Sequence, residues 1–296
     1  MAAEKDWETL FKDDKFVNNY KTGEQITAQF AYSLLDQCDI INTANNNHNK
    51  PLVVLDNACG TGIVSSILHE KLDDAVKSHW KLTCGDISPG MVEYSQRRMA
   101  GEGWQNAEVK IVDAQDTKLP SNHFTHAITA FAFMALPKAS AALDGKNEEN
   151  PTAWRNYCIF DVDRTTAGWV SVVQKAVKNI PGNLPFPSSV EYLEKTGNGK
   201  WFSTSWIESE LQQRGFVDII VKAETKSISL EVSEFLTMSM IMFPMVAKNF
   251  WTEEQRKENL DKVQPALEKY LTDVYGKNGE IPMEWTAILS TARKGN

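Results

Sequence analysis

The chain has 296 residues, of which 42% are hydrophobic and 24% are charged, so it has a globular composition and is long enough for one large α/β domain. Its net charge of −8 argues against a protein that binds phosphate backbones, which needs clustered lysine and arginine, so we expect a small-molecule substrate and no nucleic acid. Four cysteines without a C-x-x-C pair indicate neither a zinc site nor a disulfide framework, and they suit a reducing compartment.

The N-terminal segment predicts two helices within residues 4–37, where apolar residues such as Trp7, Phe30 and Leu34 recur at helical spacing. Residues 1–5 are charged and show no signal peptide. The longest apolar run, about Leu236 to Ala247, is too short to span a bilayer. We therefore expect a cytoplasmic protein without a membrane partner.

The first predicted strand covers residues 52–55, four consecutive aliphatic residues of the kind found in parallel sheets that are buried on both faces. Gly60 and Gly62 follow it, and glycines let the backbone turn sharply and approach a ligand closely. The next residues predict a helix whose free N–H groups point back at that ligand. A strand, a glycine loop and a helix in this order form a nucleotide cradle.

Spacing limits which nucleotide this cradle can hold. The phosphate loop of P-loop proteins needs Gly, four residues and then Gly-Lys-Ser/Thr, and the sequence contains no such run. The dinucleotide fingerprint needs glycines at positions 58, 60 and 63, where the chain has Ala58, Gly60 and Ile63. The loop is therefore poorly suited to bind a pyrophosphate.

Two further predicted strands end in carboxylates. The second strand ends at Asp86, and Ser88 with Pro89 predicts the start of a helix. A carboxylate at this place in nucleotide-binding α/β folds accepts hydrogen bonds from the ribose hydroxyls. The third strand, 109–112, ends in Asp113, and the fourth, 124–130, leads into Phe131. The carboxyl ends of such strands meet at one crevice, where open α/β sheets bind ligands.

The stretch from Asp56 to Gly62 resembles motif I of class I S-adenosylmethionine-dependent methyltransferases, acidic-x-Gly-x-Gly-x-Gly, with Ala58 in place of the first glycine. The resemblance implies a Rossmann-like α/β fold, a seven-stranded sheet with helices on both faces, and S-adenosyl-L-methionine as the cofactor. It also implies that Ile87 packs on adenine and that Asp113 and Ala114 meet the adenine edge.

The same resemblance supplies the remaining expected cofactor contacts. The glycine loop would pass under the methionine part of the cofactor, Asp56 would help to place its amino group, and an N-terminal lid would offer Tyr20. The full set of expected cofactor-binding residues is Tyr20, Asp56, Ala58, Cys59, Gly60, Gly62, Asp86, Ile87, Met91, Asp113, Ala114, Ala130 and Phe131.

We expect one methyltransferase domain over residues 1–296. Its parts would be an N-terminal helical lid with a polar loop (1–50), a cofactor-binding core (51–175) and a substrate-side helical cap with the final strands (176–296). Residues 144–157 are expected to be an insertion. The later predicted elements are helices at 154–164, 207–214 and 258–275 and strands at 170–173, 217–221 and 282–293, the last of them antiparallel.

The acceptor can be narrowed by what the sequence lacks. No Asn/Asp-Pro-Pro-Tyr run follows the fourth strand, no carboxylate cluster could hold magnesium, and none of the five histidines is placed to be a general base. We therefore expect metal-free transfer to an easily ionised acceptor such as a thiol, and we assign no catalytic residue. The expected substrate pocket consists of Phe131, Phe133, Met134, Trp201 and Met240.

The C-terminal part resembles fungal secondary-metabolism methyltransferases, including those that S-methylate reduced epidithiodioxopiperazines. The resemblance implies S-methylation of a reduced dithiol metabolite. Three alternatives remain: O- or N-methylation of another small metabolite, a catalytically silent cofactor-binding regulator, and a nicotinamide-dependent oxidoreductase, which Ile63 disfavours. The sequence leaves the acceptor atom and the oligomeric state open.

Overall fold

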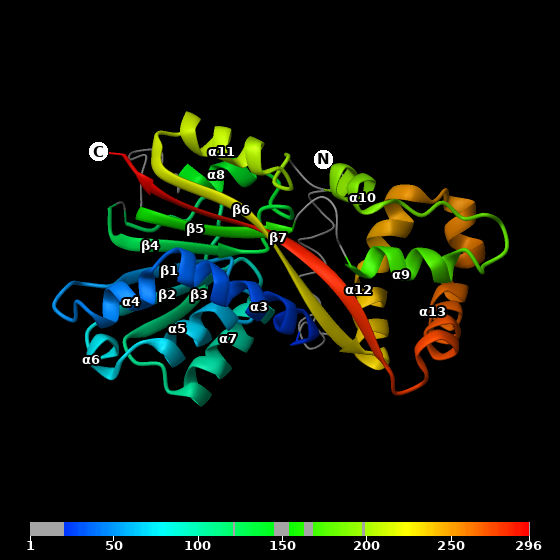
Figure 1. Cartoon of the computed structure of the whole chain (residues 1–296), viewed down its shortest axis with the longest axis horizontal. Coiled ribbons are helices and arrows are strands. Elements are labelled where there is room, and N and C mark those ends of the chain that lie inside the picture. The colour runs from blue at the N-terminus through cyan, green and yellow to red at the C-terminus, as the bar shows by residue number, and fades with distance from the viewer. Residues whose placement is uncertain (1–20, 121, 145–153, 163–167, 197–198, 296) are drawn as a thin grey trace.

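The computed structural model describes residues 21–120, 122–144, 154–162, 168–196 and 199–295. Its centre is a seven-stranded sheet with the order β3-β2-β1-β4-β5-β7-β6 (Figure 1). The strands are β1 (Val53–Asn57), β2 (Lys81–Asp86), β3 (Ala107–Ile111), β4 (Phe124–Ala130), β5 (Trp154–Val162), β6 (Phe216–Glu231) and β7 (Glu280–Lys294). β1 to β5 pair in parallel, whereas β7 runs antiparallel to both β5 and β6. The predicted α/β fold with a parallel sheet is confirmed.

Helices cover both faces of this sheet, and each face has its own hydrophobic cluster. One cluster packs α3, α5 and α7 against the sheet, and the other packs α8 and α11 against the opposite face. The helices around the sheet are α3 (Lys21–Gln37), α4 (Ile40–Asn45), α5 (Ile63–Lys71), α6 (Asp74–Lys77), α7 (Pro89–Glu102), α8 (Ala139–Asp144) and α11 (Thr204–Gln213).

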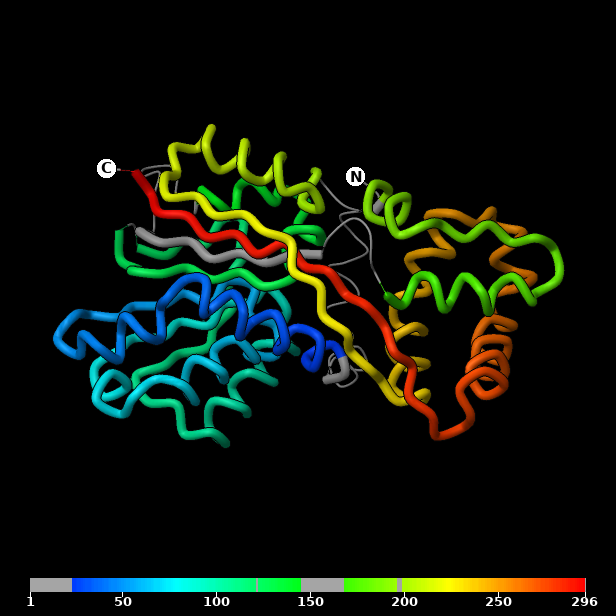
Figure 2. Tube along the Cα trace, viewed as in Figure 1, coloured from blue at the N-terminus to red at the C-terminus, as the bar shows by residue number. Residues whose placement is uncertain are grey.

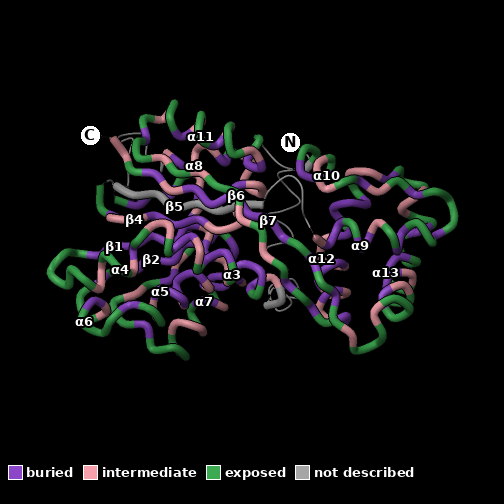
Figure 3. Tube along the Cα trace, viewed as in Figure 1, coloured by how far each residue is buried: buried purple, intermediate pink, exposed green. Residues whose placement is uncertain are grey.

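Four more helices form a group at the far end of the β6–β7 hairpin. They are α9 (Gly168–Val177), α10 (Ser189–Thr196), α12 (Val232–Phe250) and α13 (Glu253–Tyr275). Figure 2 shows β6 and β7 running side by side from the sheet to this helical group. Buried residues occur in the sheet and in the helical group alike (Figure 3), so each has a packed interior.

The local signals at the start of α7 behave as predicted. The Ser88 hydroxyl accepts a hydrogen bond from the backbone N–H of Met91 at 3.3 Å, and Pro89 occupies the first turn of the helix. This cap satisfies an N–H group that the helix itself leaves unpaired. Proline has no backbone N–H, and at the first position of a helix that group would have no partner within the helix, so Pro89 breaks no hydrogen bond there. The start of α7 directly after Asp86 therefore follows from three local residues.

Two predicted elements are wrong. Residues 154–164 were expected to be helical, but the structure has strand β5 there, so positions 154–157 of the expected insertion belong to the sheet. Residues 170–173 were expected to form the fifth strand, but they lie within helix α9. β5 pairs with β4 on one side and with β7 on the other, and this double pairing decides the conformation of its residues.

The cysteines also depart from expectation. Cys38, which follows α3, is disulfide-bonded, whereas Cys59 and Cys84 are free and buried. The sequence analysis predicted no disulfide framework and did not foresee the disulfide bond of Cys38. Across the described residues, we find no helix both long and apolar enough to cross a membrane.

Candidate functional site

The loop between β1 and α5 contains three residues with left-handed backbone conformation. The φ angles of Ala58, Gly60 and Gly62 are 56°, 55° and 78°. For a residue with a Cβ this conformation costs roughly 1–2 kcal/mol, and glycine adopts it freely. Ala58 thus has the backbone conformation of a glycine, at the position where motif I has one.

The glycine loop is bonded to the end of β2. The backbone N–H of Gly60 donates to Oδ2 of Asp86 at 2.9 Å, and the N–H of Cys59 donates to the carbonyl oxygen of Gly85 at 3.0 Å. Burial raises the pKa of the Asp86 carboxyl, while backbone hydrogen bonds from Ser88, Gly60 and Ile87 oppose the shift. These bonds favour the carboxylate form, and each oxygen has a second lone pair with which it can accept from a ligand.

Beside Asp86, the side chain of Ile87 is 39% exposed. A large aliphatic side chain exposed next to a buried carboxylate provides an apolar surface beside a hydrogen-bond acceptor. A nucleoside needs this combination, because its ribose offers hydroxyl donors and its base offers a flat face.

The end of β3 joins the same group of contacts. The N–H of Val112 donates to the carbonyl oxygen of Asp86 at 3.0 Å, and Nδ2 of Asn57 donates to the carbonyl oxygen of Ala114 at 3.5 Å. Oδ1 of Asp113 accepts from the backbone N–H of Gln115 at 2.9 Å. The structure therefore brings the ends of β1, β2 and β3 together, with Asp113 partly engaged in its own turn.

Asp56 lies under the glycine loop and is 1% exposed. Its Oδ2 accepts from the hydroxyl of Ser65 at 2.6 Å, and that hydroxyl is 3.1 Å from Sγ of Cys84. Burial raises the pKa of Asp56 to about 6, and the hydrogen bonds from Ser65 act against this shift. Asp56 therefore loses its proton near pH 6.

Several buried oxygens around this loop lack a hydrogen-bond partner within the described part of the chain. They are Oδ1 of Asp56, Oδ1 of Asn57, Oγ1 of Thr61 and Oε1 of Glu24. An unsatisfied buried polar group costs roughly 1–3 kcal/mol, so a ligand that brings N–H donors would recover this energy. The set fits a cofactor whose amino-acid end carries an ammonium group.

The end of β4 supplies two further expected residues. Ala130 ends the strand, and Phe131 follows with a φ angle of 49°. The ring of Phe131 meets that of Phe30, on α3, edge to face with centroids 6.0 Å apart. Left-handed backbone in a bulky residue is unusual and is concentrated at functional sites.

The expected substrate-pocket residues fall into two different clusters. Phe133 and Trp201 are buried and pack on each other, with ring centroids 4.4 Å apart, in the cluster that includes α8 and α11. Phe131, Met134 and Met240 are partly buried against the other cluster. Phe131 and Met134 lie just after β4, and Met240 lies on α12.

The sequence analysis missed Arg98, which contacts the loop, and its partner Glu24. The guanidinium of Arg98, on α7, donates to the carbonyl oxygen of Thr61 at 2.9 Å and forms an ion pair with Glu24 of α3 at 2.7 Å. Glu24 and Arg98 are 74 positions apart, and no local pattern connects them. Tyr20 and the other residues of 1–20 lie outside the described residues, and the buried Met91 contributes its N–H to the cap of α7.

Few titratable groups near the strand ends suit proton transfer. His126 is partly buried in β4, where desolvation lowers its pKa to about 4, and it pairs with Val54 at the amino end of β1. Within the described ranges, no group of three or more histidine, cysteine or acidic side chains could hold a metal ion. The carboxylates Asp56 and Asp86 lie beside the loop.

Comparisons with known proteins agree with this geometry. Residues 54–145, which include the glycine loop and the ends of β1 to β4, match the family model described as a methyltransferase domain. A protein of Aspergillus terreus named acetylaranotin bis-thiomethyltransferase is 37% identical over 292 residues, covering 99% of each chain. Methyltransferase tpcH of Aspergillus fumigatus is 38% identical over 287 residues, covering 97% of this chain and 99% of its own.

A solved structure shares the fold. Phosphoethanolamine N-methyltransferase 2 of Haemonchus contortus, solved with S-adenosylhomocysteine, has a TM-score of 0.52 at 12% identity, and the match covers 97% of this chain and 60% of that one. The two fungal relatives match along nearly their whole length, which leaves the nicotinamide-dependent alternative without support. The chain belongs to the class I methyltransferases of fungal secondary metabolism, and S-adenosylmethionine is its cofactor.

Proposed function

We propose that this enzyme transfers the methyl group of S-adenosylmethionine to a thiol of a small, partly hydrophobic metabolite, and that its acceptor is a reduced dithiol. The similarity to the acetylaranotin bis-thiomethyltransferase supports this proposal, because it spans 99% of both chains. It therefore continues beyond the methyltransferase domain match, which ends at residue 145, into the β6–β7 hairpin and the helical group.

The chemistry of a thiol acceptor suits the groups present. The bound cofactor supplies a methyl group on a sulfonium, which needs little activation, so the protein must mainly align the acceptor and exclude water. A thiol ionises far more readily than an alcohol and needs no strong base. His126, with a pKa of about 4, lies toward the amino end of β4, away from the glycine loop. Its position also favours a methyl acceptor that ionises without a strong base.

We propose the following roles at the cofactor site. Asp86 accepts from the ribose hydroxyls, Ile87 packs on adenine, and Asp113 with Ala114 meets the adenine edge. The loop residues Asp56, Ala58, Cys59, Gly60 and Gly62 hold the methionine part, and Met91, Ala130 and Phe131 complete the site. The bond from Gly60 to Asp86 and the exposure of Ile87 support this assignment.

We further propose that the chain works as one domain in which α3 belongs to the lid and the helical group forms the cap. α12 contains Met238, Met240, Met242 and Met245, and the first and last of these are buried. Methionine adapts to irregular apolar shapes, so α12 can line a pocket for a hydrophobic metabolite. Phe131, Met134 and Met240 would face the acceptor in this arrangement.

Mass spectrometry of an acceptor panel tests the proposal. The purified protein is incubated with S-adenosylmethionine and with dithiols, monothiols, phenols or amines, and we expect dithiols to gain one and then two methyl groups. Methylation of phenols or amines alone would support O- or N-methylation instead. If calorimetry detects S-adenosylhomocysteine binding but no acceptor yields a methylated product, the result would support a catalytically silent regulator. Titration with NAD serves as a negative control.

A further inference from the structure

The carbonyl groups of the glycine loop are held from the side by helix α7. Ser95 and Arg98 lie three positions apart on this helix, so both face the loop. The Ser95 hydroxyl donates to the carbonyl oxygen of Gly60 at 2.8 Å, and Nη1 of Arg98 donates to that of Thr61 at 2.9 Å. Two consecutive carbonyl groups therefore have their direction fixed by α7.

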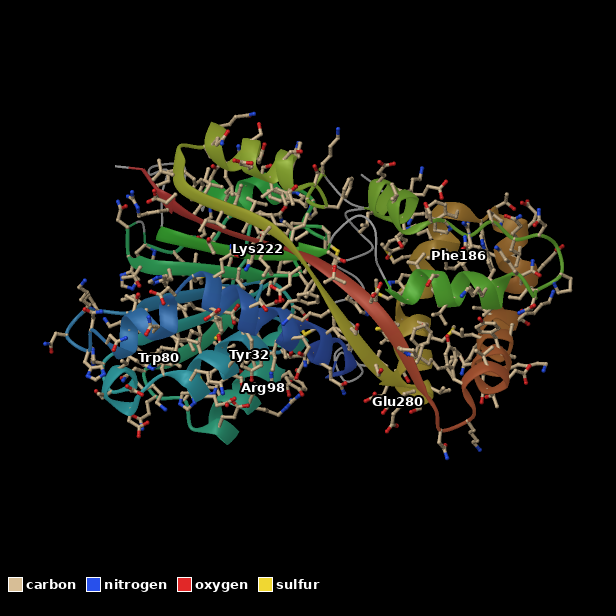
Figure 4. All side chains as sticks on the ribbon, viewed as in Figure 1. Tyr32, Trp80, Arg98, Phe186, Lys222 and Glu280 are labelled. Atoms are coloured by element: carbon tan, nitrogen blue, oxygen red, sulfur yellow. The ribbon has the colours of Figure 1, made fainter. Side chains whose placement is uncertain are left out.

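Arg98 is itself held by a buried partner from another part of the chain. Its Nη2 donates to Oε2 of Glu24 at 2.7 Å, and the exposed fractions of the two side chains are 13% and 8%. Nε of Arg98 is 3.4 Å from Glu102 on α7, and its guanidinium lies over the ring of Tyr94. Arg98 is labelled in Figure 4. A planar fork with this many fixed partners has little freedom to turn.

Glu24 lies in the first turn of α3, and this helix reaches several other parts of the protein. Phe30 meets Phe131 at the end of β4, and the hydroxyl of Ser33 donates to Glu224 of β6 at 2.7 Å. Gln25 donates to Glu234 of α12 at 3.1 Å. Through the ion pair with Arg98, which also bonds the Thr61 carbonyl, α3 is linked to the glycine loop.

The buried polar atoms near the glycine loop that lack a partner are mostly hydrogen-bond acceptors. Oε1 of Glu24, Oγ1 of Thr61 and Oδ1 of Asp56 are buried without a hydrogen-bond partner among the described residues. In S-adenosylmethionine the cationic N–H donor is the ammonium of the amino-acid end, whereas the nucleoside end is suited to Asp86 and Ile87. The contacts of Arg98 thus concern the half of the cofactor that carries the amino acid.

We propose that Arg98 and Glu24 are positioning residues for the cofactor: their ion pair seats α3 against the glycine loop and fixes the Thr61 carbonyl, and this sets the affinity for the amino-acid end. Loss of Arg98 leaves Glu24 as a buried charge without its ion-pair partner, and loss of Glu24 leaves Arg98 with only the longer contact to Glu102 at 3.4 Å. The loop and the first turn of α3 then lose their common anchor, while the Asp86 side of the site is unchanged.

Calorimetric titration of two ligands tests this proposal. S-adenosylhomocysteine carries the amino-acid end, and 5′-methylthioadenosine lacks it. We expect Arg98→Lys and Glu24→Gln each to raise the Kd for S-adenosylhomocysteine about tenfold, because each weakens a charge-assisted hydrogen bond. The Kd for 5′-methylthioadenosine should change less than about twofold. The double variant should lose less than the product of the two single losses, since both changes break one pair.

Arg97→Lys is the matched control. Arg97 is the neighbouring residue on α7, and it forms an exposed ion pair with Glu93 on the same helix. This variant should bind both ligands as the unaltered protein does. Hydrogen exchange in a peptide covering α3 gives a second readout: S-adenosylhomocysteine should slow exchange in the unaltered protein and in Arg97→Lys, and much less in Glu24→Gln.

Two results would overturn the proposal. An equal loss of affinity for both ligands would mean that the ion pair only supports the fold, and unchanged affinity for S-adenosylhomocysteine would mean that it has no role at the site. Should Arg98→Lys fail to fold, Glu24→Gln decides the matter, because glutamine keeps the shape of the side chain and removes only its charge.

Discussion

The hydroxyl of Ser95 donates to the carbonyl oxygen of Gly60 at 2.8 Å, and an added Cβ at Gly62 would lie 3.0 Å from that same hydroxyl oxygen. The same Cβ would be 3.2 Å from the ring of Trp104. Ser95 of α7 and Trp104, which follows that helix, therefore pack so closely on the loop that an added Cβ at position 62 would crowd both side chains.

Gly62→Ala should destabilise the protein by about 1–3 kcal/mol, because it adds crowding to the cost of a left-handed alanine. Gly103→Ala separates these two causes: Gly103 has a φ angle of 67°, and nothing lies within 4 Å of its added Cβ. The Gly103→Ala variant should lose only about 1 kcal/mol of unfolding free energy. Urea unfolding measures both variants, and equal losses would show that Ser95 and Trp104 yield without cost.

Ala58→Gly should stabilise the protein by about 0.5–1 kcal/mol, because it relieves the left-handed strain at a φ angle of 56°. Ala100→Gly is the control, since Ala100 is exposed in helix α7, where glycine should cost about 1 kcal/mol. The two substitutions are chemically identical and should have opposite signs in urea unfolding. A destabilised Ala58→Gly would contradict the strain argument.

Asp86→Ala should weaken S-adenosylhomocysteine binding by about 1–3 kcal/mol, because it removes charge-assisted hydrogen bonds to the ribose. Asp86→Ala should weaken the binding of 5′-methylthioadenosine to a similar extent, since both ligands carry the ribose. Glu24→Gln, in contrast, should leave the binding of 5′-methylthioadenosine nearly unchanged. Calorimetry measures both affinities. Asp116→Ala, at an exposed ion pair with Lys118, provides the control, and unchanged binding by Asp86→Ala would refute the ribose assignment.

Asp56→Asn should change how stability depends on pH. The pKa of Asp56 is about 6 in the folded protein and about 4 in an unfolded chain, so between these values the folded state binds a proton that the unfolded state has lost. The free energy of unfolding therefore falls as pH rises from about 4 to 6, by about 3 kcal/mol for this group, and the contribution is constant above that range. The variant lacks this fall.

The comparison uses the difference between the two proteins, because Asp86 has a raised pKa and titrates in both of them. Urea unfolding at a series of pH values should show the stability of Asp56→Asn rising relative to the unaltered protein across pH 4 to 6. Parallel profiles would mean that Asp56 titrates as an exposed aspartate.

The parts of the fold with strong local signals could be predicted from the sequence. The strand before the glycine loop, the cap of α7 at Ser88 and the helix ending at Tyr275 all carry residues whose chemistry decides their conformation. The exchange of helix and strand between Trp154 and Val177 shows the limit. Both runs are short and mix apolar with polar residues, and the strand conformation of β5 is decided by its pairing with β4 and β7, which lie elsewhere in the sequence.

The candidate site shows the same division. Gly60 and Asp86 follow from spacing, and the structure joins them by a hydrogen bond at 2.9 Å. The left-handed Ala58 could not be foreseen from residue type, because alanine rarely adopts this conformation. The ion pair of Glu24 with Arg98 joins α3 to α7 and depends on how the whole chain packs.

The first half of β7, Glu280 to Thr286, pairs with β6 alone, while its second half also pairs with β5. A single-residue insertion in that two-stranded ribbon would turn every following side chain to the opposite face, since side chains alternate along a strand. The four helices beyond it would then be presented to the strand ends from a different side, although β1 to β5 could still assemble. With the helical group as the cap, as proposed above, such a shift in the β6–β7 pair would alter the acceptor side of the site and leave the cofactor side in place.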